Sequence, residues 1–406
     1  MVTRRCLLTG SAAMGLSGGW PVAAAAGTAG GPRRPPRVVN RIISIPDFLN
    51  SDLASVAGTY PEHVDRYGDS ISADQNANIN HVLDRIADYA PDAVLVAGDL
   101  VEGHWGMDSL RTGIFGQVGT ETGRTAQLHR AADHYYRAWA GRFSRRGLWV
   151  LPAVGDHEIG DNFWSDWKLA NQAQFKAAFA RHFTTKPDGS PRYPDRPIGT
   201  EQEMTSYGRW VGDLYVLSVD EFTTTPESVL VTVNDEHAAW MDASLLAARA
   251  AGARALIVQG HCPVLTPVRR RHSSGLTVAT GIDSQFWDVL RTHRVELYLC
   301  GEVHDTTAYA ETGTAQISHG SLLFMGENVN FLIIDLLADG TLDLRLKQWD
   351  RVTRRLLPTV WALDMSKAAG RRVGRLADSP FRTTGAMRLN RANVAYDRRG
   401  LLREGV

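Results

Sequence analysis

The stretch at residues 93–102, AVLVAGDLVE, decides how this chain folds. Its first five residues, Ala93 to Ala97, are apolar and largely β-branched or aliphatic, which predicts a strand buried on both faces. A glycine, an aspartate and, three residues later, a glutamate follow the strand directly. Open α/β sheets build their sites at the carboxyl ends of strands. The stretch therefore predicts an α/β protein with chemically active side chains at that edge.

The same pattern recurs on both sides of this stretch, because short apolar runs alternate with helical segments from Val38 onward. We expect strands at Val38–Ile45, Ala93–Ala97, Leu148–Ala153, Leu214–Val219, Ala255–Gln259, Glu296–Cys300 and Phe331–Leu336. We expect helices at Asp74–Tyr89, Thr125–Ala140, Gln172–Phe183, Asp235–Ala251 and Ser284–His293. A single domain over residues 38–350 is the simplest division of this pattern.

Clusters of Asp, His and Glu follow five of these apolar runs. They are Ile45-Pro46-Asp47, Gly98-Asp99, Gly155-Asp156-His157-Glu158, Gly260-His261-Cys262-Pro263 and Gly301-Glu302-Val303-His304-Asp305. A pair of divalent ions needs several hard or borderline ligands from different strands and one carboxylate that bridges the ions. Glycine before a ligand lets the backbone turn sharply into the site. The five clusters therefore predict a site for two metal ions.

In this order, the clusters resemble the calcineurin-like metallophosphoesterase superfamily, whose pattern is DxH, GDxx[DE], GNH[DE], GH and GHxH. The resemblance covers roughly residues 38–340 and is strongest at GDLVE (98–102), GDHE (155–158) and QGHCP (259–263). It implies a four-layer α/β/β/α sandwich of two mixed sheets flanked by helices. It also implies that residues 38–350 form a catalytic domain, in which metal-activated water at a binuclear centre hydrolyses a phosphate mono- or diester.

The resemblance assigns Asp47 to the first metal, Asp99 to a bridging position between the two metals, and His304 to the completion of the first site. Leu49 stands where the family has the histidine of DxH, so the first metal has a reduced set of ligands. This departure leaves open a single-metal phosphodiesterase. It also leaves open a degenerate relative that binds metal or a phosphorylated ligand without turnover.

For the second metal, the resemblance implies His261 as a ligand. Asp156 replaces the family's asparagine in GNH[DE], and Glu302 replaces the first histidine of GHxH, and both can bind a metal through oxygen. Because carboxylates suit harder ions, this site favours manganese, iron, magnesium or calcium over a purely zinc site, although zinc stays among the candidates.

The resemblance also implies a catalytic role for His157, which matches the family's non-ligand histidine. That histidine stabilises the transition state or protonates the leaving oxygen. A carboxylate has to orient it, and Glu102 is our first candidate for this task, with Glu158 second.

The expected partner is a phosphorylated small molecule or a phosphodiester. Lysine plus arginine and aspartate plus glutamate each number 44, so the chain as a whole carries no charge that favours nucleic acid. The basic residues concentrate toward the end, with thirteen basic against four acidic residues over 351–406. We interpret residues 351–406 as a basic, solvated C-terminal extension. The sequence leaves the oligomeric state open.

The N-terminal segment is typical of an export signal. Residues 1–26 begin with Arg4 and Arg5, continue with small and apolar residues and end in an alanine run, as in a twin-arginine-type signal peptide. Residues 27–37 form a linker rich in Gly, Pro and Arg. We therefore expect an exported protein, periplasmic or extracellular, with no transmembrane segment in its mature form.

Two further features involve apolar or weakly polar side chains. The mature chain has room for one disulfide, between Cys262 and Cys300, but two small buried thiols are the favoured interpretation.

The long segments at residues 104–147 and 159–205 could form the rim of a pocket. Their aromatic residues lie at helical spacing, which favours core packing over a platform for substrate. These residues are Trp105, Tyr135, Tyr136, Trp139, Trp164 and Trp167.

Overall fold

A computed structural model describes residues 36–45, 73–101, 103, 115–266, 275–311, 313–319, 329–349, 381–392 and 396–403. The predicted signal peptide lies outside these residues, and so does the linker up to residue 35. No helix within the described ranges is both long and apolar enough to cross a membrane.

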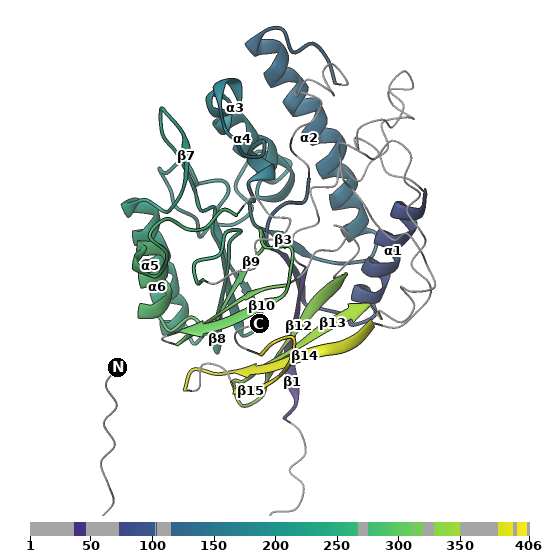
Figure 1. Cartoon of the computed structure of the whole chain (residues 1–406), viewed down its shortest axis with the longest axis vertical. Helices are drawn as coiled ribbons and strands as arrows, with labels where there is room; N and C mark the ends of the chain where they lie inside the picture. The colour runs from purple at the N-terminus through teal and green to yellow at the C-terminus, as the bar shows by residue number, and fades with distance from the viewer. Residues whose placement is uncertain are drawn as a thin grey trace, which may run out of the picture. The chain divides into compact units, whose positions relative to one another are not determined.

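Two large mixed sheets form the centre of the fold (Figure 1). In spatial order, the seven-stranded sheet contains β15 (Tyr396–Gly400), β14 (Phe381–Leu389), β13 (Leu342–Trp349), β12 (Asn330–Leu337), β1 (Val38–Ile45), β2 (Ala93–Val96) and β3 (Val150–Pro152). The six-stranded sheet contains β10 (Thr307–Glu311), β11 (Thr314–Ser318), β9 (Leu297–Cys300), β8 (Ala255–Gln259), β5 (Leu214–Ser218) and β4 (Tyr207–Val211). A separate hairpin pairs β6 (Phe222–Thr224) with β7 (Val229–Val231).

Alternate residues of the central strands belong to two different cores, because successive side chains of a strand point to opposite faces. Leu95 of β2 and Ile257 of β8 lie in the core between the sheets. Their neighbours Val94 and Val258 belong to the other core, which includes the helices. Strands that are apolar on both faces thus bury one face against the second sheet and the other against helices.

The helices cover the outer faces of the two sheets. They are α1 (Ala73–Ala87), α2 (Glu121–Ser144), α3 (Asp166–Ala170), α4 (Gln172–Phe183), α5 (Asp235–Ala250) and α6 (Gln285–Thr292), with short 3-10 turns η1 (His157–Ile159) and η2 (Gly281–Asp283). Tyr89, just after α1, packs edge-on against Phe331 of β12, and Phe286 of α6 packs edge-on against Tyr298 of β9. The expected α/β sandwich of two mixed sheets flanked by helices is confirmed.

All the strands and helices expected from the sequence are present. β1, β8 and α4 have the expected bounds, and the ends of most others differ by one to three residues. The largest difference is at α2, which begins at Glu121 because the Thr120 side chain caps it by accepting a hydrogen bond from the Gly123 N–H at 3.1 Å. The aromatic residues of α2, Tyr135, Tyr136 and Trp139, are buried in the core, as favoured above.

The prediction that residues 351–406 form a solvated extension is wrong for part of that segment. Residues 381–400 of that extension contain β14 and β15, and β14 pairs with β13 over its whole length. Met387 and Leu389 of β14 are buried in the core between the sheets, which outweighs the basic residues on the other face. Residues 351–380 lie outside the described part of the chain. The thiols of Cys262 and Cys300 are buried and form no disulfide, as expected.

Candidate metal centre

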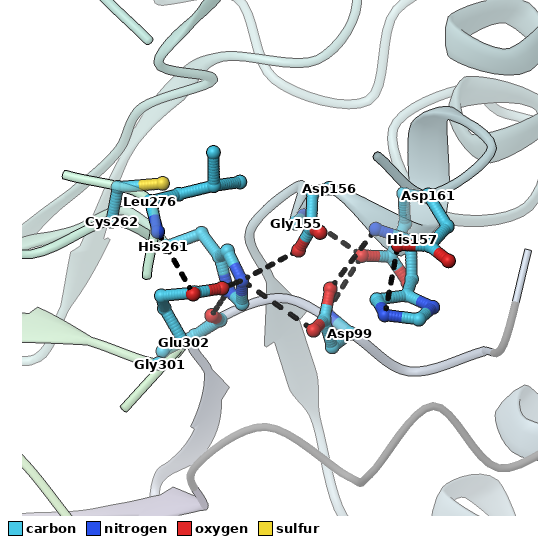
Figure 2. Close-up of polar contacts among 12 residues, drawn as sticks. Asp99, Gly155, Asp156, His157, Asp161, His261, Cys262, Leu276, Gly301 and Glu302 are labelled. Atoms are coloured by element: carbon cyan, nitrogen blue, oxygen red, sulfur yellow. Dashed lines mark hydrogen bonds and ion pairs between the residues drawn. The ribbon is translucent and has the colours of Figure 1, made fainter. Parts of the chain in front are cut away.

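Four of the predicted ligands converge where strands from both sheets end (Figure 2). Asp99 follows β2 and Asp156 follows β3 in the seven-stranded sheet. His261 follows β8 and Glu302 follows β9 in the six-stranded sheet. All four side chains are buried, although the chain between the first and last of them spans about half of the sequence. The parallel pairing of β2 with β3 and of β8 with β9 brings these ends together.

The imidazole of His261 stands at the centre of this cluster. Its Nε2 atom lies 3.0 Å from Asp156 Oδ1, 3.4 Å from Asp99 Oδ2 and 3.5 Å from Glu302 Oε2. Its Nδ1 atom lies 2.7 Å from the carbonyl oxygen of Ala97, which can only accept a hydrogen bond, so Nδ1 is the protonated nitrogen. The remaining nitrogen of the ring is therefore aimed at three carboxylates.

The donor set fits a metal ion on the evidence of two atoms that carry no hydrogen bond. His261 Nε2 and Asp156 Oδ1 are both buried, and neither has a hydrogen-bond partner among the described residues. Buried polar atoms normally have such partners, so a pair of them facing each other requires an explanation. A cation held between an imidazole nitrogen and carboxylate oxygens supplies one, and these are the atoms that bind divalent metals.

The electrostatics of the cluster point the same way. Burial lowers the pKa of His261, but the carboxylates of Asp99, Asp156 and Glu302 outweigh burial and raise that pKa well above its ordinary value. Burial raises the pKa of Asp156, but the neighbouring imidazoles of His157 and His261 outweigh burial and lower it. The carboxylates therefore create a site that favours positive charge.

Two glycines allow the strand ends to approach each other this closely. Gly98 has a φ of +90°, and a Cβ atom at this position would lie 2.6 Å from His261 Nδ1. At Gly155, a Cβ atom would lie 2.2 Å from Asp99 Oδ1. Any larger residue at either position would collide with a predicted ligand, so these glycines are part of the site rather than of a generic turn.

Glu158 holds two of the motifs together. Its Oε2 atom accepts hydrogen bonds from the backbone N–H groups of Asp99 at 2.7 Å and Gly155 at 2.8 Å, and its Oε1 atom accepts one from Leu100 at 2.8 Å. Both carboxylate oxygens are thus bound to the backbone. Glu158 was our second candidate for the carboxylate that orients His157. It does not have that role, because its carboxylate holds the loop of Asp99.

Among the described residues, Asp161 has a carboxylate that pairs with the ring of His157. Its Oδ1 atom lies 3.5 Å from His157 Nε2, and its backbone N–H donates a hydrogen bond to the carbonyl oxygen of Asp156 at 2.9 Å (Figure 2). Asp161 has a φ of +62°, in the left-handed region, directly after Gly160 at +95°. This role of Asp161 was not predicted from the sequence, although the Gly160-Asp161 pair after GDHE is typical of a sharp turn.

Two more carboxylates orient the loop of His261 and its neighbourhood. Glu221 accepts hydrogen bonds from the backbone N–H groups of His261 at 2.8 Å and Cys262 at 2.7 Å, and from the Tyr298 hydroxyl at 2.6 Å. Burial raises its pKa to about 7 against the opposing effect of these donors. Glu302 Oε1 accepts from the backbone N–H groups of Gly275 at 2.6 Å and Leu276 at 3.0 Å, which leaves Oε2 toward His261. The role of Glu221 was not predicted from the sequence.

The other predicted site residues either lie outside the described residues or lie outside the compact groups of possible ligands. Asp47, the predicted ligand of the first metal, and Glu102, the first candidate for orienting His157, lie outside the described residues. Among the described residues, the compact groups of possible ligands are Asp99–Asp156–His157 and Asp156–His261–Glu302. His304, which has a φ of +54°, belongs to neither group, so its role at the first metal stays a prediction.

A cavity of about 480 Å³ lies elsewhere, and none of the predicted ligands lines it. Its wall includes Gln172 and Lys176 of α4, together with Thr200, Glu201, Glu203, Met204 and Thr224. Lys176 is occupied there, since its Nζ atom donates to the carbonyl oxygen of Phe222 at 2.7 Å and pairs with Asp220 at 3.0 Å. The cavity is therefore not part of the metal cluster.

The fold and the buried donor set define an α/β sandwich with a candidate metal centre at its strand ends. The chain belongs to the calcineurin-like phosphoesterase family, whose model matches residues 63–305. This is a family of metal-dependent phosphoesterases, and the residue groups described above could bind a metal ion. The family resemblance inferred from the sequence motifs is confirmed.

Two solved structures are similar to this chain at low sequence identity, and one of them, PhoD, shows the same fold. PhoD is 9% identical, with a TM-score of 0.51, over 92% of this chain and 73% of its own. GAP50, described as the anchor in the inner membrane complex of Plasmodium, is 12% identical, with a TM-score of 0.44, over 86% of this chain and 90% of its own. No protein of curated function matches the sequence significantly.

Proposed function

We propose that this protein hydrolyses a phosphate mono- or diester at a centre of two divalent metal ions. Membership of the phosphoesterase family supports ester hydrolysis in general. The observation that carries the proposal for this chain is the pair of buried atoms, His261 Nε2 and Asp156 Oδ1, which lie 3.0 Å apart without hydrogen-bond partners among the described residues. A metal ion between these two atoms would satisfy both of them, and metal binding is what hydrolysis by metal-activated water requires.

One ion would be held by Asp156, His261 and Glu302, and Asp99 would bridge it to a second ion. Asp99 suits that position because its Oδ2 atom faces His261 while its Oδ1 atom accepts the backbone N–H of His157 at 3.2 Å. The second ion would use Asp47 and His304, as the sequence motifs imply. When bound, the ions would supply Lewis acidity toward the phosphoryl group and toward water.

His157 acts on the leaving group in this proposal. It is buried except for a small part of its ring, lies next to Asp156 in the same motif, and is held by its backbone N–H to Asp99. Asp161 fixes the orientation of the ring through its contact with Nε2. A positioned imidazole of this kind can donate a proton to the departing alcohol oxygen or stabilise its developing negative charge.

The test is hydrolysis of two generic esters, 4-nitrophenyl phosphate and bis(4-nitrophenyl) phosphate, by protein supplied in turn with Mn²⁺, Fe²⁺, Zn²⁺, Mg²⁺ and Ca²⁺. We expect turnover of at least one ester, lost in His261→Ala. His182→Ala is the matched control. His182 is a histidine of α4 that pairs with Asp133, which is not a residue of the metal cluster. Bound metal without hydrolysis of either ester would contradict the enzymatic proposal and favour a binding protein.

A further inference from the structure

Phe163 is an apolar side chain left almost entirely in solvent. It is 89% exposed, the highest value among the large apolar residues in the described part of the chain. Single exposed apolar side chains are common on protein surfaces, so exposure alone indicates nothing. Phe163 differs from the other exposed apolar residues because Asp161 and Asn162, just before it in the chain, contact residues of the metal cluster.

The two residues before Phe163 contact the His157 side of the cluster. Asp161 lies 3.5 Å from His157 Nε2 through its carboxylate. Asn162 donates a hydrogen bond from Nδ2 to Oδ2 of Asp156, the predicted metal ligand, at 2.8 Å. Both side chains therefore contact residues of the cluster, and a shift of their backbone would break these contacts.

The residue after Phe163 packs toward the His261 side of the cluster through one intervening aromatic residue. Trp164 packs edge-on against Phe222, with ring centroids 5.7 Å apart. Phe222 in turn lies 6.5 Å from the ring of His261. Consecutive Cα atoms are only about 3.8 Å apart. Phe163 thus stands in the chain between residues that contact His157 and Asp156 and a residue that packs toward His261 through Phe222, and its ring is exposed to solvent.

We propose that Phe163 is a specificity-determining residue that packs against an apolar, preferably aromatic, leaving group of a phosphoester bound at the metal centre. The inference rests on the proposed function and names the class of substrate that this function would select. Covering a solvent-exposed ring with an apolar group removes apolar surface from water and stabilises the complex. A polyol such as glycerol stays hydrated, so its contact with the ring stabilises the complex little.

The experiment compares 2-naphthyl phosphate with glycerol 2-phosphate as substrates of the metal-loaded protein. We expect Phe163→Ala to lower kcat/KM for the naphthyl ester roughly three- to tenfold and to leave the glycerol ester unchanged. Phe163→Tyr keeps the aromatic face and should retain the naphthyl activity. Ile198→Ala is the matched control, because Ile198 is also apolar and exposed, at 72%, and neither residue beside it in the chain is a predicted site residue. No loss, or an equal loss for both esters, would overturn the inference.

Binding of phosphonates separates this inference from the proposed function, because these compounds cannot be hydrolysed as esters. Calorimetry of the metal-loaded protein should show tighter binding of phenylphosphonate than of methylphosphonate, and Phe163→Ala should abolish that preference. A protein that turns over no ester yet shows this preference would contradict the proposed function while supporting the role of Phe163. Equal behaviour of the two phosphonates in the unmodified protein would overturn that role.

Discussion

The Oδ1 atom of Asp161 lies 3.5 Å from the Nε2 atom of His157, and both residues stand within the segment that follows β3. A carboxylate in this position orients the imidazole and limits it to one arrangement of its two nitrogens. Asp161→Ala should therefore lower kcat roughly ten- to hundredfold while KM and metal content stay unchanged. Steady-state kinetics and metal analysis of the purified variant check this expectation.

Asp161→Asn and Asp166→Ala complete that test. The amide of Asn can still contact the ring, so its kcat should lie between those of the unmodified protein and Asp161→Ala. Asp166 is an exposed aspartate at the start of α3, and its removal should have no effect on kcat. If Asp161→Ala raised KM alone, Asp161 would contact substrate rather than position His157.

His157 itself should matter for turnover and not for metal binding. Its backbone N–H contacts Asp99, and this bond survives any side-chain substitution. His157→Ala should therefore keep its metal content and lose roughly a hundredfold or more in turnover of a nitrophenyl ester. An unchanged rate would remove His157 from the reaction, and loss of metal would make it a ligand instead.

Glu158 should determine the stability of the site before any metal binds. Its two oxygens accept three backbone N–H groups, and the single carbonyl oxygen of glutamine cannot replace both. Glu158→Gln should lower the free energy of unfolding of the metal-free protein by roughly 2 kcal/mol or more, as urea denaturation would measure. Glu227→Gln, at an exposed position, is the control. Equal stability of both variants would show that these bonds are dispensable.

His237 should make the protein sensitive to acid. It is fully buried, neither ring nitrogen has a hydrogen-bond partner among the described residues, and burial lowers its pKa to about 4. Lys176 lowers this pKa further, and Asp220 opposes the shift. The unfolded chain takes up a proton near pH 6.5, whereas the folded protein does so only near the lowered pKa. Stability is therefore lost as the pH falls between these two values.

The variant His237→Phe tests this expectation, since it keeps an aromatic ring for the stacking against Trp240 at 5.5 Å and cannot titrate. Between pH 7.5 and pH 4, the unmodified protein should lose roughly 3 kcal/mol more of its free energy of unfolding than the variant. Chemical denaturation of the metal-free proteins at several pH values measures the difference. Parallel pH profiles would contradict the assignment.

The sequence predicted the central sheets well because their strands are continuous apolar runs. Ala255–Gln259 is buried on both faces and ends at Gly260, so its bounds were clear. β13 was not predicted, because its apolar residues Leu342, Leu344 and Leu346 alternate with charged residues and form no unbroken apolar run. β14 lies in a basic segment, and its charge concealed the alternation that places Met387 in the core.

The site residues that belong to sequence motifs could be predicted, whereas contacts that depend on tertiary packing could not. Asp99, Asp156, His261 and Glu302 converge as the motif order implies. Glu221 lies 40 residues before His261 and meets it only because β5 pairs with β8, so no local pattern could reveal the contact. The contact of Asp161 with His157 likewise depends on a left-handed turn that the sequence only suggests.

The most direct test of the central claim is the divalent metal content of purified protein, measured for the unmodified chain, His261→Ala and Asp99→Ala after incubation with the metal that best supports hydrolysis. We expect two ions per unmodified chain, loss of one ion in His261→Ala, and loss of both in Asp99→Ala because its carboxylate would bridge them. An unmodified chain without bound metal would rule out the metal centre, and Asp99→Ala with its full metal content would rule out the bridging role of Asp99.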